Sequence, residues 1–166
     1  IVGSDINCNV LCENGVVICH TIQESPVRYG VNFSPHDTIR FGPDEQVIRE
    51  VQKVMTRFNW HGIANIDIRR DHQTGQIYIL EINGRYWGSV IGSLKRAGLN
   101  FPSIAAHYGL GERISIPEMG KGTQVSFAKF LGSLLSLKPF SINDTKFHSY
   151  FDDPKARLMQ MTEKFR

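Results

Sequence analysis

The sequence predicts an α+β fold in which helices pack on an antiparallel sheet. Two segments are typical of β-hairpins, because each joins two β-rich runs through a short turn that contains glycine. Between the hairpins lies a segment whose apolar residues recur at helical spacing. The length of 166 residues favours one domain with a sizeable core, and an apolar content of 41% is ordinary for a globular chain.

The first hairpin is expected over residues 4–11 and 15–23, where Asn14 and Gly15 supply a tight-turn signal. A helix is expected over residues 43–59, because its first three residues, Pro-Asp-Glu, make a favourable first turn. We expect its apolar stripe to pack on the sheet. The stripe consists of Val47, Ile48, Val51, Val54, Met55 and Phe58.

The second hairpin is expected over residues 63–68 and 76–83, which a polar stretch ending on glycine joins. The positions of Asp67 and Glu81 are symmetric about Thr74, in the middle of that stretch. In an antiparallel pair the two carboxylates would therefore face each other on one side of the sheet, about 5 Å apart at Cβ.

Asn65 and Asn83 occupy the next facing pair on the same side, and Arg85 lies just beyond them. Two carboxylates at this separation repel each other unless a cation lies between them. Carboxylate and amide oxygens, with an arginine nearby, suit Mg²⁺ that also holds a nucleotide phosphate. The alternative is a surface hairpin with a solvated acidic pair.

Three stretches resemble the ATP-grasp superfamily, in particular its carbamoyl-phosphate-synthetase-like and carboxylate–amine-ligase-like branch. They read GIANIDI at 62–68, GQIYILEINGRYWGS at 75–89 and AGLNFP at 97–102. The resemblance spans residues 1–112. The Glu-x-Asn-x-Arg segment, with an acidic residue upstream on the facing strand, is its more specific part.

The resemblance implies that Asp67, Glu81 and Asn83 bind Mg²⁺, or Mn²⁺ in its place, and that Glu81 and Asn83 also bind ATP phosphates. It implies that Arg85 is catalytic and faces the γ-phosphate or the acyl-phosphate. Gly84 stands where the family usually has proline. This departure changes backbone stiffness and leaves every expected ligand in place.

The resemblance also implies that residues 1–112 are the C-terminal half of an ATP-grasp domain without its N-terminal lid. The glycine-rich loop and the nucleotide-contacting lysines would lie upstream. Residues 113–166 would be an extension with a strand at 123–130 and a last helix from Pro154. Asp5 falls where the family has a glutamate that contacts the nucleotide ribose, the alternative being an exposed aspartate at a strand end.

Ser89 is expected to cap a helix over residues 90–97, which Gly98 ends, and a further helix is expected over residues 102–108. The N-terminus of the first of these helices would suit an anion, such as a substrate carboxylate or a phosphate. The alternative is an ordinary capped helix without a ligand. Trp87 is expected in the core.

The implied function is an ATP-dependent ligase that activates a carboxylate as an acyl-phosphate for attack by an amine or a similar nucleophile. The isolated fragment would be inactive, because part of its site lies upstream. Its expected partners are small carboxylate and amine substrates and the upstream part of the polypeptide, and a homodimer is left open. The alternatives are a non-catalytic nucleotide-binding or structural module and an interaction domain whose acidic pair binds Ca²⁺.

Charge and cysteine content exclude other classes of function. The net charge of +3 comes without a basic run interleaved with aromatic residues, which argues against nucleic-acid binding. The apolar stretches are too short to span a membrane, and no signal-peptide pattern is present. Cys8, Cys12 and Cys19 lack a second metal-binding pair, so we expect reduced, packed thiols in a cytoplasmic protein.

Overall fold

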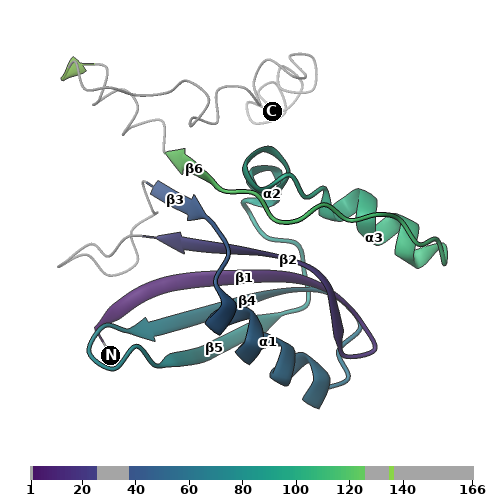
Figure 1. The fold of residues 1–166 in the computed structure, drawn as a ribbon, viewed down its shortest axis with the longest axis horizontal. Coiled ribbons are helices and arrows are strands. Elements are labelled where there is room, and N and C mark those ends of the chain that lie inside the picture. Colours follow the sequence, from purple (N-terminus) through teal and green to yellow (C-terminus); the bar gives the residue numbers. More distant parts are fainter. Residues whose placement is uncertain (1, 26–37, 126–134, 137–166) are drawn as a thin grey trace, which may run out of the picture.

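The computed structural model describes residues 2–25, 38–125 and 135–136, and these form an antiparallel sheet with helices on both faces (Figure 1). The strands are β1 (Gly3–Glu13), β2 (Val16–Ser25), β3 (Thr38–Phe41), β4 (Gly62–Asp71), β5 (Ile77–Asn83) and β6 (Gly122–Val125). The helices are α1 (Glu45–Arg57), α2 (Val90–Ala97) and α3 (Phe101–Gly109). The strand order is β5-β4-β1-β2-β3-β6, which confirms the predicted α+β fold.

The β1–β2 hairpin turns at Asn14 and Gly15, as predicted. Their φ angles of 48° and 82° lie in the left-handed region that a two-residue hairpin turn requires. Gly15 also lies against α1, since a Cβ added to it would be 3.1 Å from Thr56 Cα. Its N–H donates to Trp60 O at 2.8 Å. The turn thus needs a residue without a side chain, both for its backbone angles and for its contact with the helix.

Helix α1 begins at Glu45, later than predicted, because Asp44 is its N-cap and accepts hydrogen bonds from the backbone N–H groups of Gln46 and Val47. Three residues of the predicted stripe, on one side of the helix, are fully buried: Val47, Val51 and Met55. The prediction for Phe58 was wrong, since its side chain is 66% exposed. It lies at the C-cap, where the helical spacing ends.

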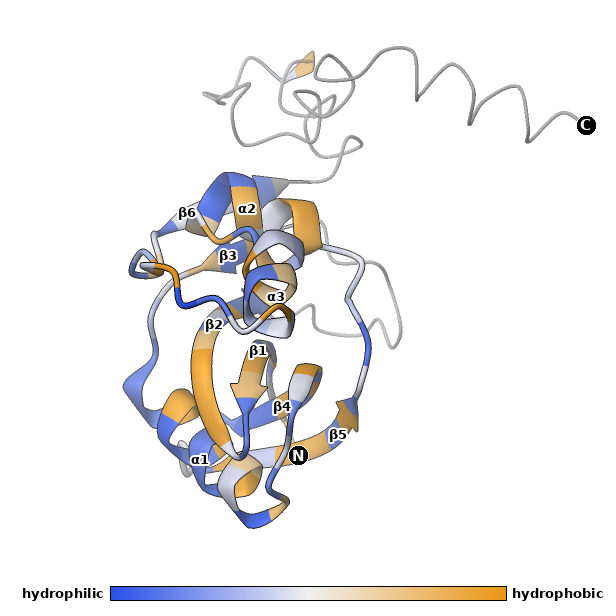
Figure 2. Cartoon of the chain, turned by 90° about the vertical axis from the view of Figure 1, so that its right-hand side faces the viewer, coloured by the Kyte–Doolittle hydropathy of each residue, from blue (hydrophilic) through white to orange (hydrophobic). Residues whose placement is uncertain are grey.

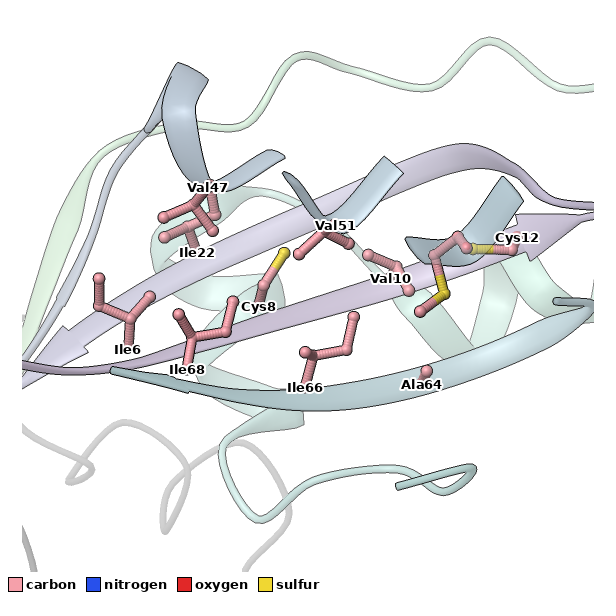
Figure 3. Close-up of a cluster of buried hydrophobic side chains, with 11 residues drawn as sticks. Ile6, Cys8, Val10, Cys12, Ile22, Val47, Val51, Ala64, Ile66 and Ile68 are labelled. Atoms are coloured by element: carbon pink, nitrogen blue, oxygen red, sulfur yellow. The ribbon is translucent and has the colours of Figure 1, made fainter. Parts of the chain in front are cut away.

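The sheet has a core on each side. Figure 2 shows α1 on one side of the strands and α2 with α3 on the other, and we call these two sides the α1 face and the α2/α3 face. Alternate residues of β1 and β4 meet α1 in the cluster of Figure 3. That cluster includes Ile6, Cys8, Val10, Val47, Val51, Ala64, Ile66 and Ile68. The second cluster, on the α2/α3 face, is Leu11, Cys19, Trp87, Leu99, Phe101 and Ile104.

The β4–β5 hairpin has the predicted register where it carries the acidic pair. Asp67 faces Glu81, but one residue further along β4 the register shifts, so that Ile68 faces Ile79. Leu80 is the extra residue of the resulting β-bulge, and it is 60% exposed.

The segment after β5 follows the predictions in part. Gly98 ends α2 with a φ of 74°, as predicted, and Trp87 is buried edge-on against Phe101 with ring centroids 4.7 Å apart. The predicted cap was wrong, because the Ser89 hydroxyl caps no backbone group and instead donates to Gln23 Oε1 at 2.6 Å.

The chain after α3 returns to the sheet as β6, which pairs with β3 (Figure 1). This strand covers the start of the segment predicted at 123–130. The rest of that segment, and the last helix predicted from Pro154, lie outside the described residues. The division at residue 112 stays a prediction. Within the described residues, no helix combines the length and the apolar character that crossing a membrane would need.

Candidate functional site

Polar side chains form two rows across four strands of the α2/α3 face. The first row, from β2 to β5, is Gln23, Asn7, Asp67 and Glu81. The second row is Thr21, Asn9, Asn65 and Asn83. Each residue faces the next in its row across a strand pair, so the side chains of a row lie on the same side of the sheet. The predicted residues Asp67, Glu81 and Asn83 thus lie together at the β5 end of the rows.

The acidic pair is the electrostatic centre of the first row. Burial raises the pKa of the Asp67 carboxyl above its usual range, and the facing Glu81 carboxylate raises that pKa further. Arg85 and the hydrogen bond that Asn7 Nδ2 donates to Asp67 Oδ1 oppose this rise. Within the described part of the chain, neither Asp67 nor Glu81 forms an ion pair. The pair is therefore a place where a cation would relieve repulsion.

These oxygens fit a divalent cation that is only partly held by protein. Two carboxylates and the Asn83 amide oxygen are hard ligands of the kind Mg²⁺ prefers. No three His, Cys, Asp or Glu side chains among the described residues come together to hold a metal ion. Phosphate oxygens and water would complete the coordination of Mg²⁺, whereas a structural Ca²⁺ site would need more protein oxygens.

Arg85 and Asp5 lie near this pair in different ways. Arg85 is exposed and its Nη1 donates to Tyr86 O at 3.1 Å, yet its charge reaches Asp67 and lowers the pKa of that carboxyl. Asp5 lies on the same face, and its Oδ1 accepts a hydrogen bond from Arg69 Nη1 at 2.9 Å. The ribose contact expected of Asp5 stays a prediction, and it would compete with this ion pair.

Sequence reasoning missed the β1 and β2 members of the rows. Asn7 and Asn9 continue the alternation that starts at Asp5, so the pattern of β1 could have placed them on one face. Gln23 and Thr21 gave no local signal. All four belong to the same rows as the predicted ligands only because β1 pairs with both β2 and β4.

The described cavities lie away from the acidic pair. The larger has a volume of about 250 Å³ and lies at the other end of β1 and β4, where His61, Ile63, Tyr86 and Tyr108 contribute to its wall. None of the predicted site residues lines it.

Comparison with known proteins places the fold. A family model described as "ATP-grasp in the biosynthetic pathway with Ter operon" matches residues 11–129. The L-amino acid ligase of Bacillus licheniformis is similar at 21% identity and a TM-score of 0.55, over 69% of this chain and 30% of that one. Pyruvate carboxylase of Rhizobium etli is similar at 18% identity and a TM-score of 0.57, over 74% of this chain and 14% of that one.

A third similar structure is the biotin carboxylase domain of Hydrogenobacter thermophilus 2-oxoglutarate carboxylase, in complex with MgADP, ADP and bicarbonate. It shows 15% identity and a TM-score of 0.54, over 74% of this chain and 29% of that one. The chain thus spans less than a third of each of these three proteins. The search of curated proteins gives no match.

The solved structures share the fold at low identity, whereas the family model covers most of the sequence. Its match contains the facing strands β4 and β5, the polar residues at their centre and the helices that follow. The family predicted from the residue pattern of this hairpin is therefore confirmed, and the chain belongs to the ATP-grasp family.

Proposed function

We propose that this chain supplies the magnesium- and phosphate-binding surface of an ATP-dependent ligase that activates a carboxylate as an acyl-phosphate. The observation that carries the proposal is the facing pair Asp67 and Glu81, in which neither carboxylate forms an ion pair with a described residue. Family membership supplies the chemistry that such a pair would serve.

The acidic and amide side chains would bind the cation, and the arginine would bind the phosphoryl group. Asp67, Glu81 and Asn83 would hold Mg²⁺, which when bound neutralises charge on the phosphates during transfer. The Arg85 guanidinium, already within electrostatic reach of Asp67, would bind the transferring phosphoryl group and then the acyl-phosphate. Asp5 would contact the ribose after releasing Arg69.

No side-chain nucleophile is needed for this reaction, and the described cysteines are poorly suited to be one. Burial raises the pKa of Cys12 to about 11 and that of Cys19 to about 12, and it also raises the pKa of Cys8. The nucleophile would instead be an amine substrate. The name of the L-amino acid ligase supports this choice. The upstream part of the polypeptide would supply the lid over the nucleotide.

The test is Glu81→Gln in the full-length protein, with ADP release measured in the presence of Mg-ATP and mixed amino acids. The substitution keeps the shape and removes the charge, so we expect turnover to fall by at least a hundredfold, as for a lost cation ligand. Glu118→Gln, at an exposed position outside the rows, is the matched control. Unchanged turnover in Glu81→Gln would reject the metal role.

The second candidate function is a nucleotide-binding module without catalysis. The ion pair between Asp5 and Arg69 favours it, because this pair occupies a side chain expected to contact the nucleotide. A full-length protein that binds Mg-ATP but releases no ADP with any amino acid mixture would establish this alternative.

A further inference from the structure

A buried chain of hydrogen bonds joins α2 to the second row of the site. Trp87 Nε1 donates to Ser93 Oγ at 3.2 Å, and Ser93 Oγ lies 3.3 Å from Thr21 Oγ1. Asn9 Nδ2 donates to Thr21 Oγ1 at 3.4 Å, and Asn65 Nδ2 donates to Asn9 Oδ1 at 2.7 Å. All five residues are buried. We call this chain of contacts the Ser93 relay.

The relay has a direction, which the donor groups set. An indole N–H can only donate, so Ser93 Oγ accepts from Trp87. Thr21 Oγ1 accepts from Asn9, and its own hydrogen is then available to Ser93. At the far end, Asn65 uses its NH₂ group on Asn9.

This direction decides what Asn65 offers to the site. One N–H of its NH₂ group is donated to Asn9, which turns that group toward β1, so the carboxamide oxygen is the atom we assign to a ligand beside the facing Asn83. An oxygen there suits a divalent cation, whereas an NH₂ group would repel it. Side chains that hold a ligand's orientation in this way typically tune metal sites from behind.

We propose that Ser93 is a positioning residue for the cation end of the site, acting through Thr21 and Asn9 to hold the oxygen of Asn65 beside Asn83. This inference rests on the proposed function. Ser93 itself would contact neither phosphate nor cation. Helix α2 follows the segment that carries Arg85. The contact between Ser93 and Thr21 therefore also attaches this helix to β2, at the other end of the row from Asn83.

The experiment compares Ser93→Ala and Thr21→Val, alone and together, in the full-length protein. Both remove one hydroxyl from the relay, and the second keeps the side-chain shape. Mn²⁺ affinity is measured by electron paramagnetic resonance in the presence of ADP, alongside the Mg²⁺ dependence of turnover. Ser103→Ala, on an exposed part of α3, is the matched control.

We expect each single variant to weaken Mn²⁺ binding roughly tenfold, as for other residues behind a metal ligand. The double variant should lose no more than about tenfold in Mn²⁺ affinity, because both substitutions interrupt the same chain of hydrogen bonds. ADP affinity without metal, and all properties of Ser103→Ala, should stay at the wild-type level.

Wild-type Mn²⁺ affinity in folded Ser93→Ala and Thr21→Val would overturn the proposal, and so would losses that multiply to about a hundredfold in the double variant. If Ser93→Ala does not fold, the shape-conserving Thr21→Val decides alone. Glu81→Gln separates the two levels of the argument. If that variant also binds Mn²⁺ normally, the proposed function fails; if it loses Mn²⁺ while the relay variants keep it, only the role of Ser93 fails.

Discussion

Replacing Asp67 by Asn should stabilise the nucleotide-free protein while it destroys the cation site. Asn keeps an oxygen that can accept the hydrogen bond from Asn7, so the main change is the loss of one of two facing charges. At about 5 Å, two like charges repel by roughly 1 to 3 kcal/mol for effective dielectric constants between those of water and a protein surface. Glu81 is exposed and Arg85 partly compensates, so we expect a gain of about 1 kcal/mol at neutral pH.

The gain in folding stability of Asp67→Asn over the wild type should increase as the pH rises. The folded-state pKa of Asp67 is raised above the ordinary value of 3.8, so between these two values the folded protein binds more protons than the unfolded chain. Stability of the wild type therefore falls as the pH rises through this window. The variant lacks that loss, so its advantage should be present at pH 7 and should vanish as the pH falls below 3.8.

The assay is urea denaturation of the full-length protein without nucleotide and with a chelator, followed from neutral to acidic pH. Asp71→Asn is the control: its oxygen can still accept from the N–H groups of Gln73 and Thr74, and its strand neighbour on β1 is Gly3. Mg-ATP should raise the melting temperature of the wild type and leave that of Asp67→Asn unchanged. A variant that is less stable at pH 7, or a gain that is equal at all pH values, would refute the reasoning.

Three further substitutions or treatments test the fold. Gly15→Ala should cost about 1 to 2 kcal/mol through its left-handed backbone, whereas Gly42→Ala, where an added Cβ meets nothing within 4 Å, should be neutral in the same thermal melt. Trp87→Ala should cost about 3 to 5 kcal/mol in urea denaturation, because it empties a buried aromatic site. Cys12 and Cys19, with pKa values raised to about 11 and 12, should resist a thiol reagent at pH 8 until the protein is unfolded; rapid labelling of the native protein would contradict their burial.

The acidic hairpin could be predicted from sequence because its geometry is local. Symmetry about the observed turn alone would place Asp67 opposite Leu80, and the bulge at Leu80 brings Glu81 there instead. The hairpin itself could be predicted, because only one short turn separates its two strands. The same holds for Asn14 and Gly15, whose conformation depends on their own backbone preferences.

The rest of the polar rows depends on contacts between distant segments. Asn7 meets Asp67 only because β1 pairs with β4, and no feature of either strand alone names its neighbour. Ser89 shows the same limit. Its sequence position favours a helix cap, but its hydroxyl donates instead to the amide oxygen of Gln23 on β2. Asp5 likewise forms an ion pair with Arg69 on the neighbouring strand β4.

The bulge at Leu80 changes which residues of β5 lie on each side of the sheet. Ile77, Ile79 and Ile82 all pack against the α1 cluster, although strict alternation would give Ile79 and Glu81 the same side. One surplus residue therefore lets a single strand keep its isoleucines inward and still aim a carboxylate the opposite way. Leu80 could therefore be deleted without exchanging the two sides, because the shortened strand would alternate regularly and still pair Ile79 with Ile68 and Glu81 with Asp67.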